Sequence, residues 1–257
     1  MTSPSSLPLP VAPIVAFVGN YGSGKTEVAV NYALQLADTG RTLAIADLDL
    51  VNPYFRCREA LTPLEERGIR VVVPRGANFH GELPIILPEV RGLLNGSHQT
   101  AILDVGGDDV GARALSHLAP DFPKPGAYEL WQVINRQRPF TDTVAGCLKM
   151  RDQIEQSSRL TITGLVANSH LMDETTSEII EQGYQLARDV GREANLPVVM
   201  LVVSNKFWPD KLRSETNLDD IACPVLAIDR QMTPPWVDDS ASLGWAGERE
   251  RLRLTGG

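Results

Sequence analysis

The chain has 257 residues, a formal net charge of −8, 43% hydrophobic residues and 22% charged residues. This composition is that of an ordinary globular protein, so it excludes a largely disordered or fibrous chain. Three scattered cysteines are too few for a disulfide scaffold or for a zinc site of paired cysteines. The acidic balance argues against broad nucleic-acid binding, which requires a basic face.

The N-terminal residues carry no targeting or membrane signal. Residues 1–10 contain no Lys or Arg, so they lack the charged start of a signal peptide. The apolar run at residues 11–18 is shorter than the about 20 residues that cross a bilayer. Together with the free cysteines, this predicts a cytoplasmic protein that does not bind membranes.

Short apolar runs alternate with longer amphipathic stretches along most of the chain. The runs are rich in β-branched residues on consecutive positions, which is typical of parallel strands buried on both faces. They lie at residues 14–18, 42–46, 71–73, 101–105, 129–134, 161–167, 198–203 and 225–228. Helices are expected at residues 26–38, 55–67, 86–94, 110–118, 141–156, 174–194 and 210–214.

This alternation predicts an α/β fold: a doubly wound, mostly parallel sheet with helices on both faces. We expect a flexible lead-in at residues 1–12 and a single domain at residues 13–228. An irregular tail is expected at residues 229–257, with a short helix at 248–254. Ligands of such sheets bind at the carboxyl ends of the strands.

The strongest motif is Gly19–Thr26, a full GxxxxGK[ST] match that follows a predicted strand and precedes a predicted helix. Its glycines let backbone N–H groups curl around phosphate oxygens, and the helix N-terminus adds a positive dipole. Lys25 would sit between the β- and γ-phosphates, and the Thr26 hydroxyl would bind Mg²⁺. The residues expected to bind the nucleotide here are Gly19, Asn20, Tyr21, Gly22, Ser23, Gly24, Lys25, Thr26 and Glu27.

Two acidic strand ends complete the predicted P-loop site. Asp104 ends an apolar strand, as the acid of a Walker B motif does, and would hold Mg²⁺ through water. Gly106 and Gly107 would let the following segment approach a γ-phosphate and move when it leaves. Asp47 and Asp49 lie two residues apart, so they face the same side of an extended chain. A solvated acidic turn is the alternative for this second pair.

At these motifs the sequence resembles the MinD/ParA/nitrogenase-iron-protein group of P-loop ATPases, in the SIMIBI class. Residues 104–108 (DVGGD) resemble the DVxGD switch of the iron protein, and residues 163–169 resemble that family's GLxxNS strand end. The resemblance covers residues 13–205. It implies that Asp49 positions the hydrolytic water, that Asp47 supports the metal, that Asp108 senses the γ-phosphate and that Asn168 contacts the base.

The sequence departs from that family at two places. Many members carry a second lysine that reaches the partner's nucleotide across a dimer, and Asn20 stands at its position here. The iron protein carries a cluster cysteine shortly after its switch, and residues 109–112 contain none. The resemblance therefore implies a nucleotide-dependent homodimer with a protein partner, but no iron–sulfur cluster.

The base is expected to be adenine. Small GTPases read guanine with NKxD, but here Asp210 falls two positions late after Asn205 and Lys206. Asn205 lies at a strand end, where the base is expected, and would help to bind it. The segment at residues 135–141 also follows a strand end, so its arginines point to the functional rim or lie in a solvated loop.

These features predict an Mg-ATP-dependent switch ATPase, in which Lys25, Asp49 and Asp108 serve the hydrolysis. Thr26, Asp47 and Asp104 would hold the metal. Two alternatives remain. One is an ATP-dependent ligase or kinase of the dethiobiotin or cobyrinate synthetase type, acting on a small carboxylate. The other is a nucleotide-binding adaptor with negligible turnover.

Overall fold

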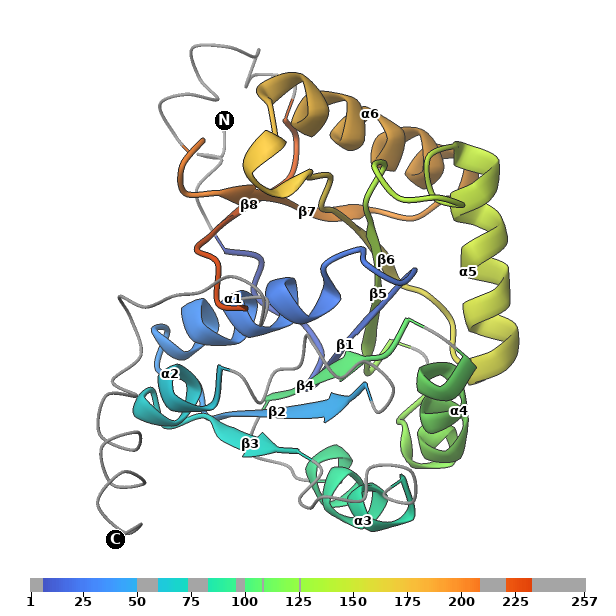
Figure 1. The fold of residues 1–257 in the computed structure, drawn as a ribbon. Helices are drawn as coiled ribbons and strands as arrows, with labels where there is room; N and C mark the ends of the chain where they lie inside the picture. The colour runs from blue at the N-terminus through green and yellow to red at the C-terminus, as the bar shows by residue number, and fades with distance from the viewer. Residues whose placement is uncertain are drawn as a thin grey trace, which may run out of the picture.

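A computed structural model of the chain describes residues 7–49, 60–73, 83–95, 100–107, 109–124, 126–208 and 221–232. Its centre is an eight-stranded sheet in the order β3-β2-β4-β1-β5-β6-β7-β8, and all neighbouring strands are parallel (Figure 1). The predicted α/β fold is therefore confirmed. The strands are β1 Ile14–Val18, β2 Leu43–Leu48, β3 Arg70–Val72, β4 Thr100–Val105, β5 Glu129–Ile134, β6 Gly164–Ala167, β7 Val198–Ser204 and β8 Val225–Ile228.

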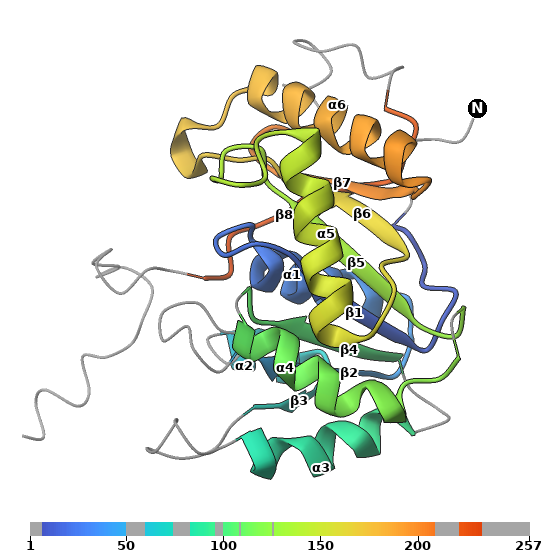
Figure 2. The same ribbon diagram turned by 90° about the vertical axis from the view of Figure 1, so that its right-hand side faces the viewer.

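Helices cover both faces of the sheet. The helix α1 (Lys25–Ala37) and the short α2 (Leu61–Glu66) pack on one face. The opposite face carries α3 (Leu83–Leu94), α4 (Asp109–Leu118), α5 (Val144–Ser158) and α6 (Ser177–Ala194), and Figure 2 shows α4 and α5 in front of the sheet. Because both faces are covered, every residue of β1, β2 and β4 is buried. This is why these strands are apolar on consecutive positions.

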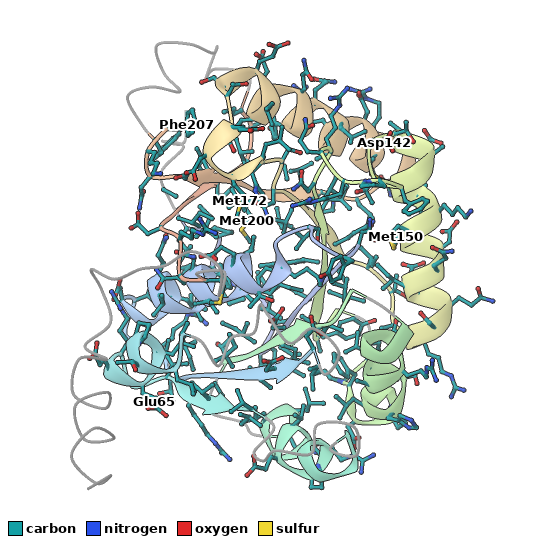
Figure 3. All side chains as sticks on the ribbon, in the orientation of Figure 1. Glu65, Asp142, Met150, Met172, Met200 and Phe207 are labelled. Carbon is teal, nitrogen blue, oxygen red and sulfur yellow. The ribbon has the colours of Figure 1, made fainter. Side chains whose placement is uncertain are left out.

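An aromatic cluster fixes α1 against the centre of the sheet. Phe17 of β1, Tyr32 of α1 and Trp131 of β5 contact one another edge to face, with ring centroids 5.5–5.7 Å apart. All three side chains are buried, and Met200 of β7 belongs to the same core (Figure 3). Edge-to-face pairs add about 0.5–1.5 kcal/mol each beyond the burial of apolar area. The cluster therefore holds the loop between β1 and α1 in a defined position.

Several element ends differ from the sequence prediction because side chains cap them. The helix α5 begins at Val144 because the Thr143 hydroxyl accepts the Gly146 N–H at 3.2 Å. Similarly, α6 begins at Ser177 because Thr176 caps it. The strand β6 begins at Gly164 instead of residue 161, and the N–H of Ile162 is donated to the Glu155 carboxylate at 2.8 Å.

Chain ends that were expected to be irregular pack on the domain in their described parts. In the predicted lead-in, the Pro8 carbonyl accepts a hydrogen bond from the Tyr32 hydroxyl at 2.8 Å, and Ala12 is buried. At the other end, Met232 is buried against the core that surrounds α1. The helices predicted at residues 210–214 and 248–254, and residues 55–59 of another, lie outside the described residues.

Within the described ranges, no helix is both long enough and apolar enough to cross a bilayer.

Candidate functional site

The Gly19–Thr26 loop connects β1 to α1 as the motif predicts. Gly22 and Gly24 adopt left-handed backbone conformations, with φ of 71° and 87°. Glycine is required at Gly24 for a second reason, since a Cβ there would lie only 2.4 Å from the Asn168 Nδ2. The loop thus turns tightly and places the first residues of α1 at the carboxyl edge of the sheet, where helix N–H groups attract anions.

Lys25 is the cation of this loop. Its side chain is buried, and its Nζ donates a hydrogen bond to the Asn20 carbonyl at 3.1 Å. The ammonium group is therefore held across the loop, within the turn that the glycines make. A buried cation beside a helix N-terminus fits a polyphosphate ligand.

Three carboxylates meet beside the loop, as the sequence predicts. Asp47 of β2 and Asp104 of β4 are direct neighbours in the register of these two strands, and both are completely buried. Asp49 is 7% exposed, and its backbone N–H donates to Asp47 Oδ1 at 2.9 Å. This strand pairing places both predicted acidic motifs at one point of the sheet edge.

The carboxyl group of Asp104 is strongly perturbed. Burial, with a smaller contribution from nearby Asp49, raises its pKa to about 7, although the Thr26 hydroxyl and Lys25 oppose the shift. Among the described residues, neither carboxylate oxygen of Asp104 has a hydrogen-bond partner of good geometry. A buried carboxylate in this state lacks the partner that native proteins normally supply, which suggests that a ligand supplies it.

The donor set fits Mg²⁺, which prefers oxygen ligands and usually retains several waters. In the part of the chain that the structure describes, no group of three or more His, Cys, Asp or Glu side chains could bind a metal ion by itself. Mg²⁺ would therefore be held by the Thr26 hydroxyl, phosphate oxygens and water, with Asp47 and Asp104 hydrogen-bonded to that water.

The two asparagines predicted near the base lie at the same edge but play different parts. Asn168 follows β6, is 4% exposed, and donates from Nδ2 to the Ser23 carbonyl at 2.8 Å. It therefore contacts the loop itself. Asn205 follows β7, is exposed, and donates to the Asp229 carboxylate at 2.8 Å.

The Glu27 side chain points away from the loop, toward the segment that follows β8. Its carboxylate accepts the backbone N–H groups of Gln231 at 2.6 Å and Met232 at 3.1 Å. Asn31, one turn later, donates to the Asp229 carbonyl at 3.0 Å. Glu27 thus ties residues 229–232 to α1 through its side chain, and only its backbone lies in the first turn that faces an anion.

Among the remaining predicted loop residues, some side chains are bonded or buried within the protein and others are exposed. Asn20 donates to the Pro139 carbonyl at 2.8 Å, whereas the Tyr21 side chain is 63% exposed. Ser23 is fully buried. Gly19 leaves no room for a side chain, because a Cβ there would lie 2.5 Å from the Val133 carbonyl oxygen. Asp108 lies outside the described residues.

Two residues outside the Gly19–Thr26 motif, Arg138 and His170, also lie against the loop. Arg138 donates from Nε to the Gly22 carbonyl at 2.9 Å. The Nε2 of His170 would lie 3.3 Å from a Cβ on Gly24. Burial and the nearby Arg138 and Arg230 lower the pKa of His170 to about 4, so its imidazole is neutral at physiological pH. In the sequence, only the positions of Arg138 and His170 after predicted strands indicated that these residues lie at this edge of the sheet.

Gly107 provides a test of how tightly the segment after β4 approaches the loop. A Cβ on Gly107 would lie 2.7 Å from the Lys25 Nζ and 2.7 Å from the Tyr21 backbone nitrogen. Gly107→Ala is therefore expected to displace Lys25 and to weaken nucleotide binding about tenfold or more. Isothermal titration calorimetry with Mg·ATP would measure this loss.

Gly92→Ala is the matched control, because nothing lies within 4 Å of a Cβ at that position of α3. It should leave the affinity unchanged. Equal affinities for the Gly107 variant and the wild type would show that the segment after β4 does not confine Lys25.

Comparison with known proteins shows the fold. No protein-family model matches the sequence, and no curated protein matches it. The chain is similar to the crystal structure of the cell division protein FtsY from Thermotoga maritima, with 16% identity and a TM-score of 0.51. The match covers 77% of this chain and 65% of that one.

Two further structures are similar and are in complex with GDP. The signal recognition particle receptor FtsY from Elizabethkingia anophelis has 16% identity and a TM-score of 0.52, over 76% of this chain and 58% of its own. The 54 kDa signal recognition particle protein from Aeropyrum pernix K1 has 20% identity and a TM-score of 0.50, over 76% and 42%.

The chain thus spans less than two thirds of the length of each of these proteins. At such low identities, the likeness shows the α/β fold alone. The narrower resemblance to MinD and ParA rests on the motifs alone.

Proposed function

We propose that this protein is a Mg²⁺-dependent switch ATPase that hydrolyses the β–γ bond of ATP. The observation that carries the proposal is the meeting of a buried cation, Lys25, with the buried Asp104 at the curled loop before α1. A buried lysine at a helix N-terminus suits phosphate, and a buried carboxylate with so few hydrogen-bond donors around it suits a hydrated cation. Both requirements are met by a Mg-nucleotide.

Each residue of the site then has a defined part. The loop N–H groups and Lys25 would bind the phosphates and offset the charge that develops on them. Asp47 and Asp104 would orient the waters around the metal, and Asp49 would orient the attacking water. When bound, Mg²⁺ would neutralise charge on the β- and γ-phosphates. Asp108 is proposed to sense the γ-phosphate from the segment after β4.

The chemistry near Asn168 favours adenine. Its Nδ2 uses one of two N–H groups on Ser23, so the second can serve a purine ring nitrogen. Guanine presents additional N–H donors that call for a carboxylate, but Leu171 stands three residues after Asn168. GTP is the competing substrate, because two similar structures are in complex with GDP and Asp173 and Asp229 lie at the same edge.

The nucleotide state is proposed to remodel the segments around Asp49 and Gly107, and thereby a homodimer and the contact with a protein partner. Asn20 does not supply a cation to a partner subunit. Its side chain is bonded to Pro139 within the same chain, and no positive charge stands at its position. A trans-acting charge in such a dimer would have to come from another residue.

Product analysis tests the proposed activity. Purified protein is incubated with Mg·ATP or Mg·GTP, with and without small carboxylic acids, and the products are separated by anion-exchange chromatography. The proposal predicts ADP and free phosphate in equal amounts, with ATP preferred to GTP and no need for a carboxylate. A phosphorylated or ligated carboxylate would indicate the synthetase alternative. Tight binding without phosphate release would indicate the adaptor.

A further inference from the structure

The loop that follows β5, residues 135–141, reaches back onto the phosphate-binding loop. Two hydrogen bonds join them: Asn20 Nδ2 donates to the Pro139 carbonyl at 2.8 Å, and Arg138 Nε donates to the Gly22 carbonyl at 2.9 Å. The loop is itself closed by the Thr141 hydroxyl, which donates to the Asn135 carbonyl at 3.0 Å. Arg138 is therefore presented to Gly22 by a braced segment.

The guanidinium of Arg138 lies directly against the glycine turn. A Cβ on Gly22 would be 3.2 Å from its Nε and 3.5 Å from its Cζ. None of the ion pairs found among the described residues includes Arg138. A guanidinium has five N–H donors, and the bond to Gly22 uses one of them. The remaining donors and the full positive charge stay at the edge of the turn.

Arg138 and Asn168 hold consecutive carbonyls of the loop. Arg138 binds the carbonyl of Gly22, and Asn168 binds that of Ser23 at 2.8 Å. In a planar trans peptide the N–H lies opposite the C=O, so fixing a carbonyl outward turns its N–H inward. Accordingly, the Ser23 N–H points across the loop to the Asn20 carbonyl, 3.2 Å away, which also accepts Lys25 Nζ.

We propose that Arg138 is a positioning residue of the nucleotide site: it fixes the Gly22–Ser23 peptide and adds a second positive charge, beside Lys25, for the polyphosphate. The proposal rests on the proposed nucleotide binding. It also gives the Asn20 side chain a role, because its hydrogen bond to the Pro139 carbonyl anchors the residue next to Arg138. The cation that Asn20 does not provide is thus supplied from the neighbouring loop of the same chain.

Arg136 offers a matched control, because it belongs to the same loop but points elsewhere. Its guanidinium donates to the Gln182 side chain of α6 at 2.9 Å. Its backbone N–H, which donates to the Ser169 hydroxyl at 2.9 Å, is retained in an alanine variant. Substituting either arginine by alanine removes the same charge and the same number of atoms, so the pair isolates the effect of position.

The experiment measures dissociation constants of Mg·ATP and AMP by calorimetry for the wild type, Arg138→Ala, Arg138→Lys and Arg136→Ala. Arg138→Ala is expected to weaken Mg·ATP binding about tenfold or more and AMP binding much less, because the charge acts on the polyphosphate. Arg138→Lys should restore part of the loss, since it returns the charge without the planar Nε–H. Arg136→Ala should bind both ligands within about twofold of the wild type.

Three outcomes would count against the assignment of Arg138. Unchanged Mg·ATP affinity in Arg138→Ala would overturn it. Equal losses for ATP and AMP, accompanied by a lower melting temperature, would show that Arg138 only braces the fold. A loss of the same size in Arg136→Ala would show that the effect is not specific to the contact with Gly22. Failure of the wild type to bind any nucleotide would instead contradict the proposed function, and the role of Arg138 with it.

Discussion

Replacing Lys25 by alanine is expected to weaken Mg·nucleotide binding by at least about 30-fold, as measured by calorimetry. Lys25 is buried, and its Nζ is held across the loop by the Asn20 carbonyl at 3.1 Å. Truncating one partner of a buried, hydrogen-bonded charge pair costs about 2–5 kcal/mol. Each 1.4 kcal/mol is a factor of about ten in affinity, so the loss should lie between about 30-fold and several thousand-fold.

Lys149→Ala provides the control for this experiment. Lys149 is an exposed lysine of α5, on the face of the sheet opposite α1, so its loss changes the net charge equally without touching the loop. Its affinity should match that of the wild type. If Lys25→Ala kept wild-type affinity, the loop before α1 would not be the phosphate site, even if the protein bound nucleotide elsewhere.

Replacing Asp104 by asparagine is expected to have opposite effects on the empty and the loaded protein. Burial raises the pKa of Asp104 to about 7, whereas the carboxyl group of an unfolded chain titrates near 3.8. Between these values the folded protein retains a proton that the unfolded chain releases, so raising the pH favours unfolding. Ionised Asp104 therefore destabilises the nucleotide-free protein, and the cost is complete above pH 7.

At pH 8, Asp104→Asn should raise the unfolding free energy of the nucleotide-free protein, on the order of 2 kcal/mol, or about 5 °C in melting temperature. The gain should shrink as the pH falls toward 4, where the wild-type carboxyl is also neutral. With Mg·ATP present the order should reverse, because the variant lacks the carboxylate that orients the metal-bound water. Calorimetric melting at pH 4.5 and 8, with and without Mg·ATP, measures both effects.

Asp152→Asn is the matched control, since Asp152 is an exposed carboxylate of α5 that pairs with its neighbour Arg151. Surface pairs of this kind contribute little, so this variant should melt close to the wild type at either pH. A nucleotide-free Asp104→Asn protein that is less stable than the wild type at pH 8 would contradict the conclusion that ionised Asp104 destabilises the nucleotide-free fold.

The fold could be predicted because its strands are continuous apolar runs. The strands at residues 14–18, 129–134 and 225–228 have the predicted bounds in the structure. Because these strands are buried on both faces, their residues are apolar on consecutive positions, and the length of the apolar run gives the length of the strand. Helix starts were less predictable. Thr143 and Thr176 each cap a helix that the apolar pattern began three residues too early. A cap depends on one side chain, which periodicity does not register.

The candidate site was predictable where it lies in contiguous motifs and not where it depends on contacts between distant loops. Lys25 and Asp104 follow from local spacing and from the strand register that brings β2, β4 and β1 together. Strand-end position placed Arg136 and Arg138 at one rim, but only the turn of the loop decides that Arg138 meets Gly22. Glu27 is the opposite case. It belongs to the contiguous motif, but its side chain accepts a hydrogen bond from the Gln231 N–H and points away from the loop.

Thermal unfolding of the wild-type protein tests most directly the claim that the loop before α1 binds a nucleotide. The melting temperature is measured without ligand, with Mg²⁺ alone, and with millimolar Mg·ATP or Mg·GTP. A ligand that binds only the folded state must stabilise it by mass action, by about 2.7 kcal/mol at 100 times its dissociation constant. We predict a rise of several degrees that is larger with Mg·ATP than with Mg·GTP. An unchanged melting temperature with both nucleotides would contradict the account.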